Sequence, residues 1–140
     1  MWSNFSAMPG LLKFLTAHAL GMSVLLVASV IPHGSFVIYG RPVSYAEWWS
    51  SGAGPFASLL GITLPLSGIL FLRRNSRARI IYLASIGIAM IGPYLIHHEP
   101  ASAAFGVLLF AFGVWYLYRR PAVVAYFAPN KRSRGGASME

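Results

Sequence analysis

The sequence predicts an all-α integral membrane protein, a four-helix bundle with a short interfacial helix in its first external loop. Of its 140 residues, 56% are hydrophobic and only 10% are charged. A soluble domain carries about 25% charged residues, so this composition cannot supply a water-facing surface. A basic run also separates two apolar segments: Arg73-Arg74-Asn75-Ser76-Arg77-Ala78-Arg79. Because loops rich in Lys and Arg stay in the cytoplasm, this run predicts a membrane hairpin.

Four apolar segments have the length that a membrane-spanning helix needs, about 20 residues. We expect spans over residues 11–31, 55–72, 80–96 and 101–118, forming a single domain over residues 1–128. Pro65 predicts a kink in the second helix, and Pro93 a kink or an end in the third. A cleaved signal peptide is the alternative for the first segment, but the apolar run after Lys13 exceeds the roughly 7–15 residues of such a peptide's apolar region. We therefore expect a retained helix.

The longest connection, residues 33–53, is rich in the aromatic side chains that collect at lipid headgroups. Ser44 and Glu47 have the spacing of a capping box, which predicts a short helix from about Tyr45 lying in the interface. We expect the partner-binding residues of the protein to be Tyr45, Trp48 and Trp49. Adjacent residues on a helix point about 100° apart, so one tryptophan should anchor at the headgroups. The other is then free to meet a partner or to cover the mouth of the bundle.

The distribution of basic residues predicts the orientation. Nine of the eleven Lys and Arg lie in the middle loop and the C-terminal tail. We expect the topology to rest on Arg73, Arg74, Arg77 and Arg79, with both termini cytoplasmic in a multi-pass protein of a bacterial-type inner (plasma) membrane. Residues 129–140 should form a basic, disordered cytoplasmic tail. Because the basic residues flank apolar segments, the expected anionic partner is the lipid bilayer and not nucleic acid.

Small residues recur at helical spacing in every predicted span, as close helix packing in lipid requires. The first span offers Ala17, Gly21 and Ala28; the second offers Gly54, Ser58, Gly61, Pro65 and Gly68; the third offers Ser85, Ala89 and Gly92; the fourth offers Ser102, Gly106 and Gly113. We expect these faces to pack inside one bundle, with a subunit interface as the alternative.

Groups able to carry chemistry are scarce. No Asp or Glu lies inside a predicted membrane span, which disfavours a proton-coupled transporter. The chain has no cysteine, which excludes disulfides and thiol catalysis, and no Ser-His-acid pattern is present. His18 is the one histidine well inside a span, and we expect it to be a helix-bonded polar residue. It lies about 22 Å along the helix from His33, so the two cannot ligate one ion. We therefore do not expect an enzyme.

A metal site is the alternative use of the outer face. His33, His97, His98 and Glu99 fall at similar depth if the helices are antiparallel, and imidazole with carboxylate suits a transition metal or haem. Two features weigh against this site. Adjacent histidines cannot easily face one ion, and Glu99 can instead complement the dipole of the helix that follows it.

Two functions follow from these patterns. The first is a small non-catalytic inner-membrane protein that acts by protein–protein contact, as an accessory or assembly subunit or an immunity-type protein, and binds no cofactor. Its partner would be another membrane or periplasmic protein or a second copy of the chain. The second is a metal- or cofactor-binding membrane protein that uses the outer histidines, for example as a subunit of a redox complex.

Overall fold

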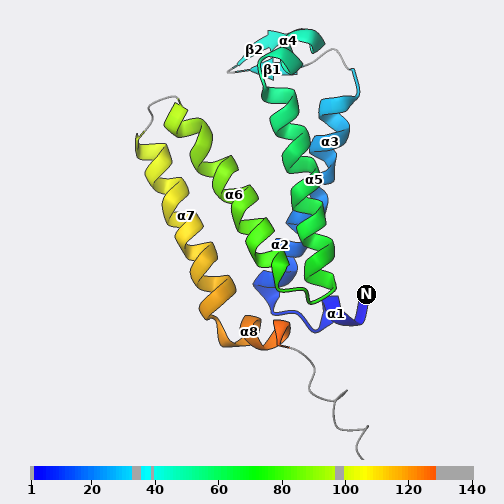
Figure 1. Cartoon of the computed structure of the whole chain (residues 1–140), viewed down its shortest axis with the longest axis vertical. Helices are drawn as coiled ribbons and strands as arrows, with labels where there is room; N and C mark the ends of the chain where they lie inside the picture. The colour runs from blue at the N-terminus through cyan, green and yellow to red at the C-terminus, as the bar shows by residue number, and fades with distance from the viewer. Residues whose placement is uncertain (1, 33–35, 39, 97–99, 129–140) are drawn as a thin grey trace, which may run out of the picture.

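The structure is a computed structural model that describes residues 2–32, 36–38, 40–96 and 100–128, and most of these are helical (Figure 1). Four antiparallel helical stretches run the length of the molecule. They are α2 (Gly10–Gly21) continued by α3 (Ser23–Val30), α5 (Ala53–Leu72), α6 (Arg77–Ile96) and α7 (Pro100–Arg119).

Three of these stretches are long and apolar enough to cross a membrane, namely Gly10–Val30, Ala53–Leu72 and Pro100–Arg119. The predicted long apolar helices are therefore confirmed for the first, second and fourth segments. In the third segment α6 begins at Arg77, three residues before the predicted start of the span. It also continues through Pro93 to Ile96, so the helix does not end at the proline.

The first stretch is not one uninterrupted helix. Its two parts meet at Met22. The φ of this residue, −67°, is helical, but its ψ, −7°, departs from helical geometry. Met22 is flanked by Gly21 and Ser23, and glycine–serine pairs are a common cause of helix breaks. The predicted apolar segment over residues 11–31 is therefore present as Gly10–Val30, with a local break at Met22 that the sequence analysis did not predict.

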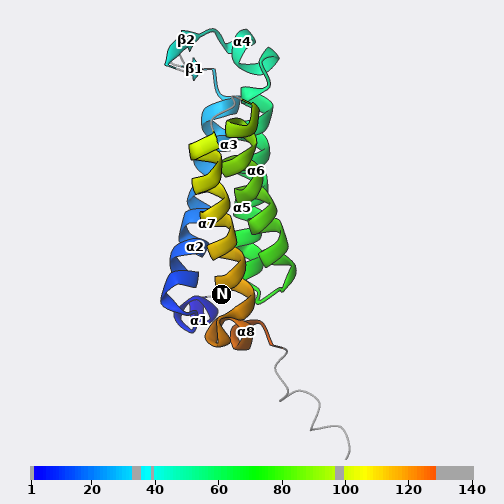
Figure 2. The ribbon, with the colours of Figure 1, turned by 90° about the vertical axis from the view of Figure 1, so that its left-hand side faces the viewer.

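The two ends of the molecule differ in structure (Figures 1 and 2). One end, called here the basic end, holds the α5–α6 turn together with α1 (Trp2–Ser6) and α8 (Pro121–Phe127). The other end carries β1 (Phe36–Ile38), β2 (Arg41–Val43) and α4 (Tyr45–Ser50), called here the cap.

The strands in the cap correct the all-α prediction. β1 and β2 pair antiparallel, with Phe36 opposite Val43 and Ile38 opposite Arg41. The connection contains Gly40 with φ +76°, a conformation that favours glycine. Strands of three residues are too short to show an alternating pattern, which is why the sequence did not predict them.

Small residues on α5 and α7 allow close helix crossings, as the sequence predicted. Gly54, Gly61 and Gly68 lie seven residues apart, so they share one face of α5. A Cβ on Gly61 would lie 2.4 Å from the backbone nitrogen of Leu26 in α3. On α7, a Cβ on Gly106 would lie 2.5 Å from the carbonyl oxygen of Met90 in α6.

The predicted small face of the first span was wrong. Gly21 has no atom within 4 Å of an added Cβ, and Ala17 is exposed. The inward face of α2 instead carries Leu12, Thr16 and Ala19, which are fully buried. The choice between two faces of a uniformly apolar helix depends on tertiary packing, which composition does not reveal.

The most deeply buried side chains gather toward the basic end. Phe71 of α5, Leu12 of α2, Leu117 of α7 and Val123 of α8 have no exposed surface. Toward the cap, the α6–α7 pair diverges from α3 and α5 (Figure 1). The core therefore lies mainly toward the basic end, while the cap contacts α3 and α5.

Candidate functional site

The cap is joined to the helices by specific contacts. Tyr45, the first residue of α4, donates a hydrogen bond of 3.0 Å to the carbonyl of Val30, the last residue of α3. Carbonyls in the last turn of a helix lack intrahelical partners, so this bond satisfies one of them. At the other end of α4, Gly52 has φ +85°, which lets the chain turn directly into α5.

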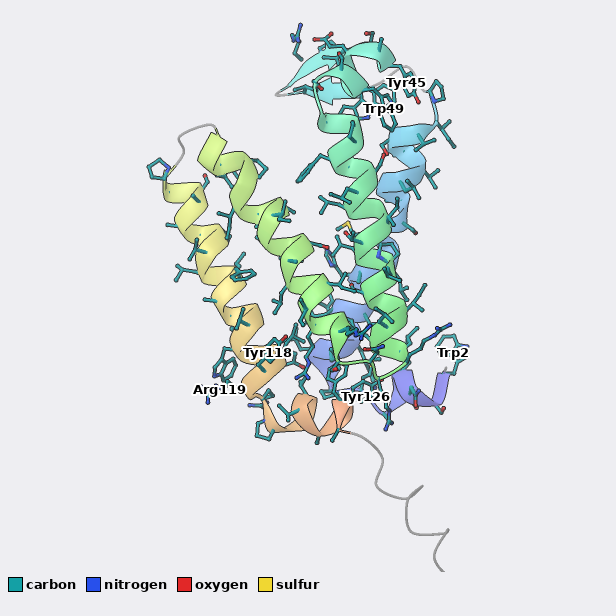
Figure 3. The ribbon with its side chains drawn as sticks, viewed as in Figure 1. Trp2, Tyr45, Trp49, Tyr118, Arg119 and Tyr126 are labelled. Atoms are coloured by element: carbon teal, nitrogen blue, oxygen red, sulfur yellow. The ribbon has the colours of Figure 1, made fainter. Side chains whose placement is uncertain are left out.

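The aromatic residues of the cap form one cluster (Figure 3). Trp48 stacks on Phe36 with ring centroids 5.3 Å apart, and Trp49 meets Tyr45 edge-on at 6.2 Å. Both indoles lie on Gly54 in the first turn of α5, where an added Cβ would be 2.9 Å from Trp48 and 3.1 Å from Trp49. The three expected partner-binding residues are therefore brought together, and both tryptophans are half-buried within the cap.

The predicted α4 helix is present, and Ser44 is its N-cap. The Ser44 hydroxyl accepts a hydrogen bond from the backbone N–H of Glu47 at 3.2 Å. The Glu47 carboxylate forms an ion pair with Arg41 of β2. This ion pair ties the hairpin to α4, and the sequence alone does not predict it because it depends on the fold of the loop.

The indole N–H groups of Trp48 and Trp49 are buried without a hydrogen-bond partner among the residues that the structure describes. Buried polar groups are nearly always paired, to protein or to ordered water. Both N–H groups therefore lie inside the cap, and that of Trp48 is next to Gly54 of α5.

The four arginines predicted to fix the topology lie together at the basic end, but they are not equivalent. Arg73 and Arg77 are exposed. Arg74 lies over the ring of Tyr126 at 4.9 Å. Arg79 lies over Tyr118 at 4.7 Å and over Phe127 at 4.9 Å, and donates to the Leu117 carbonyl at 3.3 Å. Two of the four therefore also hold α8 and α7 against the turn.

The turn itself has a defined geometry. Arg74 has φ +55°, its N–H donates to Phe71 O, and the N–H of Asn75 donates to Leu70 O, both at 3.0 Å. These are the two hydrogen bonds of a Schellman motif, which closes a helix C-terminus. The Asn75 side chain then accepts from the N–H of Arg77 at 3.0 Å, which starts α6.

A polar pair that the sequence analysis did not bring together lies between α2 and α6. The Tyr82 hydroxyl is 3.4 Å from Nδ1 of His18, and both residues line a cavity of ≈360 Å³ with α7 on its third side. The sequence does not pair His18 with Tyr82, because the two residues are 64 positions apart in the chain. One sequence feature does indicate that Tyr82 faces the other helices: it lies one helical turn before Ser85, on the predicted packing face of its span.

The predicted metal ligands His33, His97, His98 and Glu99 all lie outside the described residues, so that site stays a prediction. Within the described ranges, no three His, Asp or Glu side chains lie close enough together to hold an ion. No protein-family model, curated protein or solved structure matches this chain.

Proposed function

We propose that the chain is a four-span protein of a bacterial-type inner membrane with both termini in the cytoplasm. α6 supports a fourth span because it has 20 residues, the same length as α5, and packs against both α5 and α7. A helix of this length is about 30 Å long, the thickness of a hydrocarbon core. Aromatic residues at both ends of the molecule are typical of the two headgroup levels (Figure 3).

The charge distribution supports the orientation. Arg41 is the one described basic residue in the cap, and it is paired with Glu47. The other described basic residues lie at the basic end: Lys13, Arg73, Arg74, Arg77, Arg79, Arg119 and Arg120. The positive-inside rule then places the basic end in the cytoplasm and the cap outside.

We further propose that the protein is non-catalytic and acts by contact through the cap, as an accessory or assembly subunit or an immunity-type protein. The observation that carries this proposal is the docking of an aromatic cluster on α3 and α5 by Tyr45 and Gly54. Binding residues concentrate in loops held by a rigid scaffold, and tryptophan and tyrosine are enriched at interface centres. The proposed partner is another membrane or periplasmic protein, or a second copy.

The test is site-specific photo-crosslinking in cells. Val37 is 53% exposed in the cap, and Leu108 is 68% exposed on α7 at membrane depth. A photoreactive phenylalanine at position 37 should give one discrete protein adduct, which disappears when Trp48 and Trp49 are replaced by alanine at equal protein level. The same group at position 108 should give lipid adducts only. Failure of every exposed cap position to form a discrete adduct would overturn the proposal.

A further inference from the structure

The cavity between α2, α6 and α7 differs chemically from the rest of the helix surface. Its walls are aliphatic and aromatic. The side-chain polar groups among its lining residues are the imidazole of His18 and the hydroxyls of Tyr82 and Tyr116. Its volume of ≈360 Å³ falls within the range of small-molecule sites, about 300–1,000 Å³. Ionisable groups at membrane depth most often mark a functional site. His18 lies eight residues from Gly10, about 12 Å along the helix from the basic end.

The hydrogen bond between His18 and Tyr82 is weak. A separation of 3.4 Å between the hydroxyl and Nδ1 is longer than a normal hydrogen bond. Among the described residues, Tyr82 is the hydrogen-bond partner found for the His18 side chain. The pair thus presents one hydroxyl and one imidazole to the cavity, and a ligand oxygen can bridge them.

Aromatic rings stand on two walls of the cavity. On α2, Phe14 stacks on the imidazole of His18 with an interplanar angle of 21°. On α7, Phe112 stacks on Tyr116 with the same angle. Aromatic rings pack favourably against other aromatic rings, so these two walls suit a ligand that contains one. Phe14 is 65% exposed, so an apolar ligand can reach the cavity sideways, from the hydrocarbon.

We propose that this cavity binds a neutral, planar-ring lipid with a ring carbonyl or hydroxyl, of the quinone class, whose ring oxygen bonds to Tyr82 and His18. The residues that line the cavity include no Lys, Arg, Asp or Glu to pair with an ionic headgroup, and burying an unpaired charge there is costly. The polar pair distinguishes such a ligand from a bare acyl chain. The proposal rests on the membrane location proposed above but not on contact through the cap.

The test titrates purified full-length protein in detergent with decylubiquinone, following the fluorescence of Trp115, whose ring lies 5.8 Å from that of Phe112. A Trp115→Phe variant identifies its signal. We expect saturable quenching. Tyr82→Phe, which keeps the ring, and His18→Leu should each weaken binding roughly 2–10-fold, the factor expected for one hydrogen bond.

Two controls make the result decisive. Ser85→Ala removes a similar bond between helices, from Ser85 to Thr63 at 2.8 Å, and should leave affinity unchanged because Ser85 does not line the cavity. Gly113→Leu fills the cavity from α7 and should abolish saturable quenching. Quenching that never saturates would overturn the proposal, and so would parental affinity in both the Tyr82→Phe and the His18→Leu variants. Equal competition by decylbenzene would show a simple acyl-chain groove and would also overturn it.

Discussion

At the residue scale, helix packing depends on a few positions where a side chain has no room. Gly61→Ala and Gly106→Ala place a Cβ within 2.4 and 2.5 Å of backbone atoms of a neighbouring helix. We expect each to destabilise the protein by about 1–3 kcal/mol, the usual cost of overpacking. Gly92→Ala is the matched control, because an added Cβ there meets nothing within 4 Å.

Unfolding of these variants by denaturing detergent in mixed micelles measures the difference. The control should be neutral or more stable than the parent by about 0.5–1 kcal/mol, since alanine is the better helix former. A control as damaging as Gly61→Ala would show that backbone flexibility, and not helix contact, sets the cost.

A second residue-scale prediction concerns the bond between α3 and α5. The hydroxyls of Ser29 and Ser58 are 2.7 Å apart, and Ser29 is almost fully buried. Replacing both by alanine, singly and together, should give a coupling energy of about 0.6 kcal/mol, the average for hydrogen bonds between membrane helices. The measurement is a double-mutant cycle in the same assay. A coupling indistinguishable from zero would mean that the bond does not stabilise the folded protein.

At the element scale, α8 closes the basic end. Tyr126 donates a hydrogen bond of 3.0 Å to the Phe71 carbonyl, and its ring lies under Arg74. Tyr126→Ala should release α8 and raise trypsin cleavage between residues 73 and 79 in inside-out vesicles several-fold. Val124→Ala, at an exposed position of the same helix, should not. Equal cleavage of the two variants, measured by mass spectrometry, would contradict this role for α8.

Ionisation of Tyr126 gives a linked prediction. Burial raises the pKa of Tyr126 above its usual value of 10.0, and the neighbouring Arg74 partly offsets the rise. A raised pKa in the folded state means that docking of α8 is complete below pH 10 and is lost as pH rises through the folded pKa. A phenolate absorbance titration should therefore show one fewer late-titrating tyrosine in Tyr126→Phe than in the parent protein.

The element scale also shows what the sequence could and could not predict. Long apolar runs predicted the helices, and the Ser44 cap predicted the start of α4, because both signals are local. The β1–β2 hairpin was missed because its strands are too short to show a pattern. The attachment of Arg74 and Arg79 to α8, and of His18 to Tyr82, depends on helices far apart in the chain. Those contacts follow from packing, which periodicity does not encode.

At the scale of the whole molecule, contact and cofactor binding predict opposite results for the outer histidines. If the protein acts by contact, purified protein should carry no stoichiometric metal, and the double variant His97→Ala and His98→Ala should keep the adduct formed at position 37. Metal analysis and an absorption spectrum check the first point. A bound metal that disappears together with activity in the double variant would favour the cofactor function.

The central claim, a four-span protein with the cap outside, can be tested directly because the chain has no cysteine. Single cysteines at Val37 in the cap, Ser76 in the α5–α6 turn and Ala101 at the start of α7 are all exposed. A membrane-impermeant maleimide should label positions 37 and 101 in intact cells, and position 76 only after permeabilisation. Labelling of position 76 in intact cells, or protection of position 37 or 101, would contradict the account.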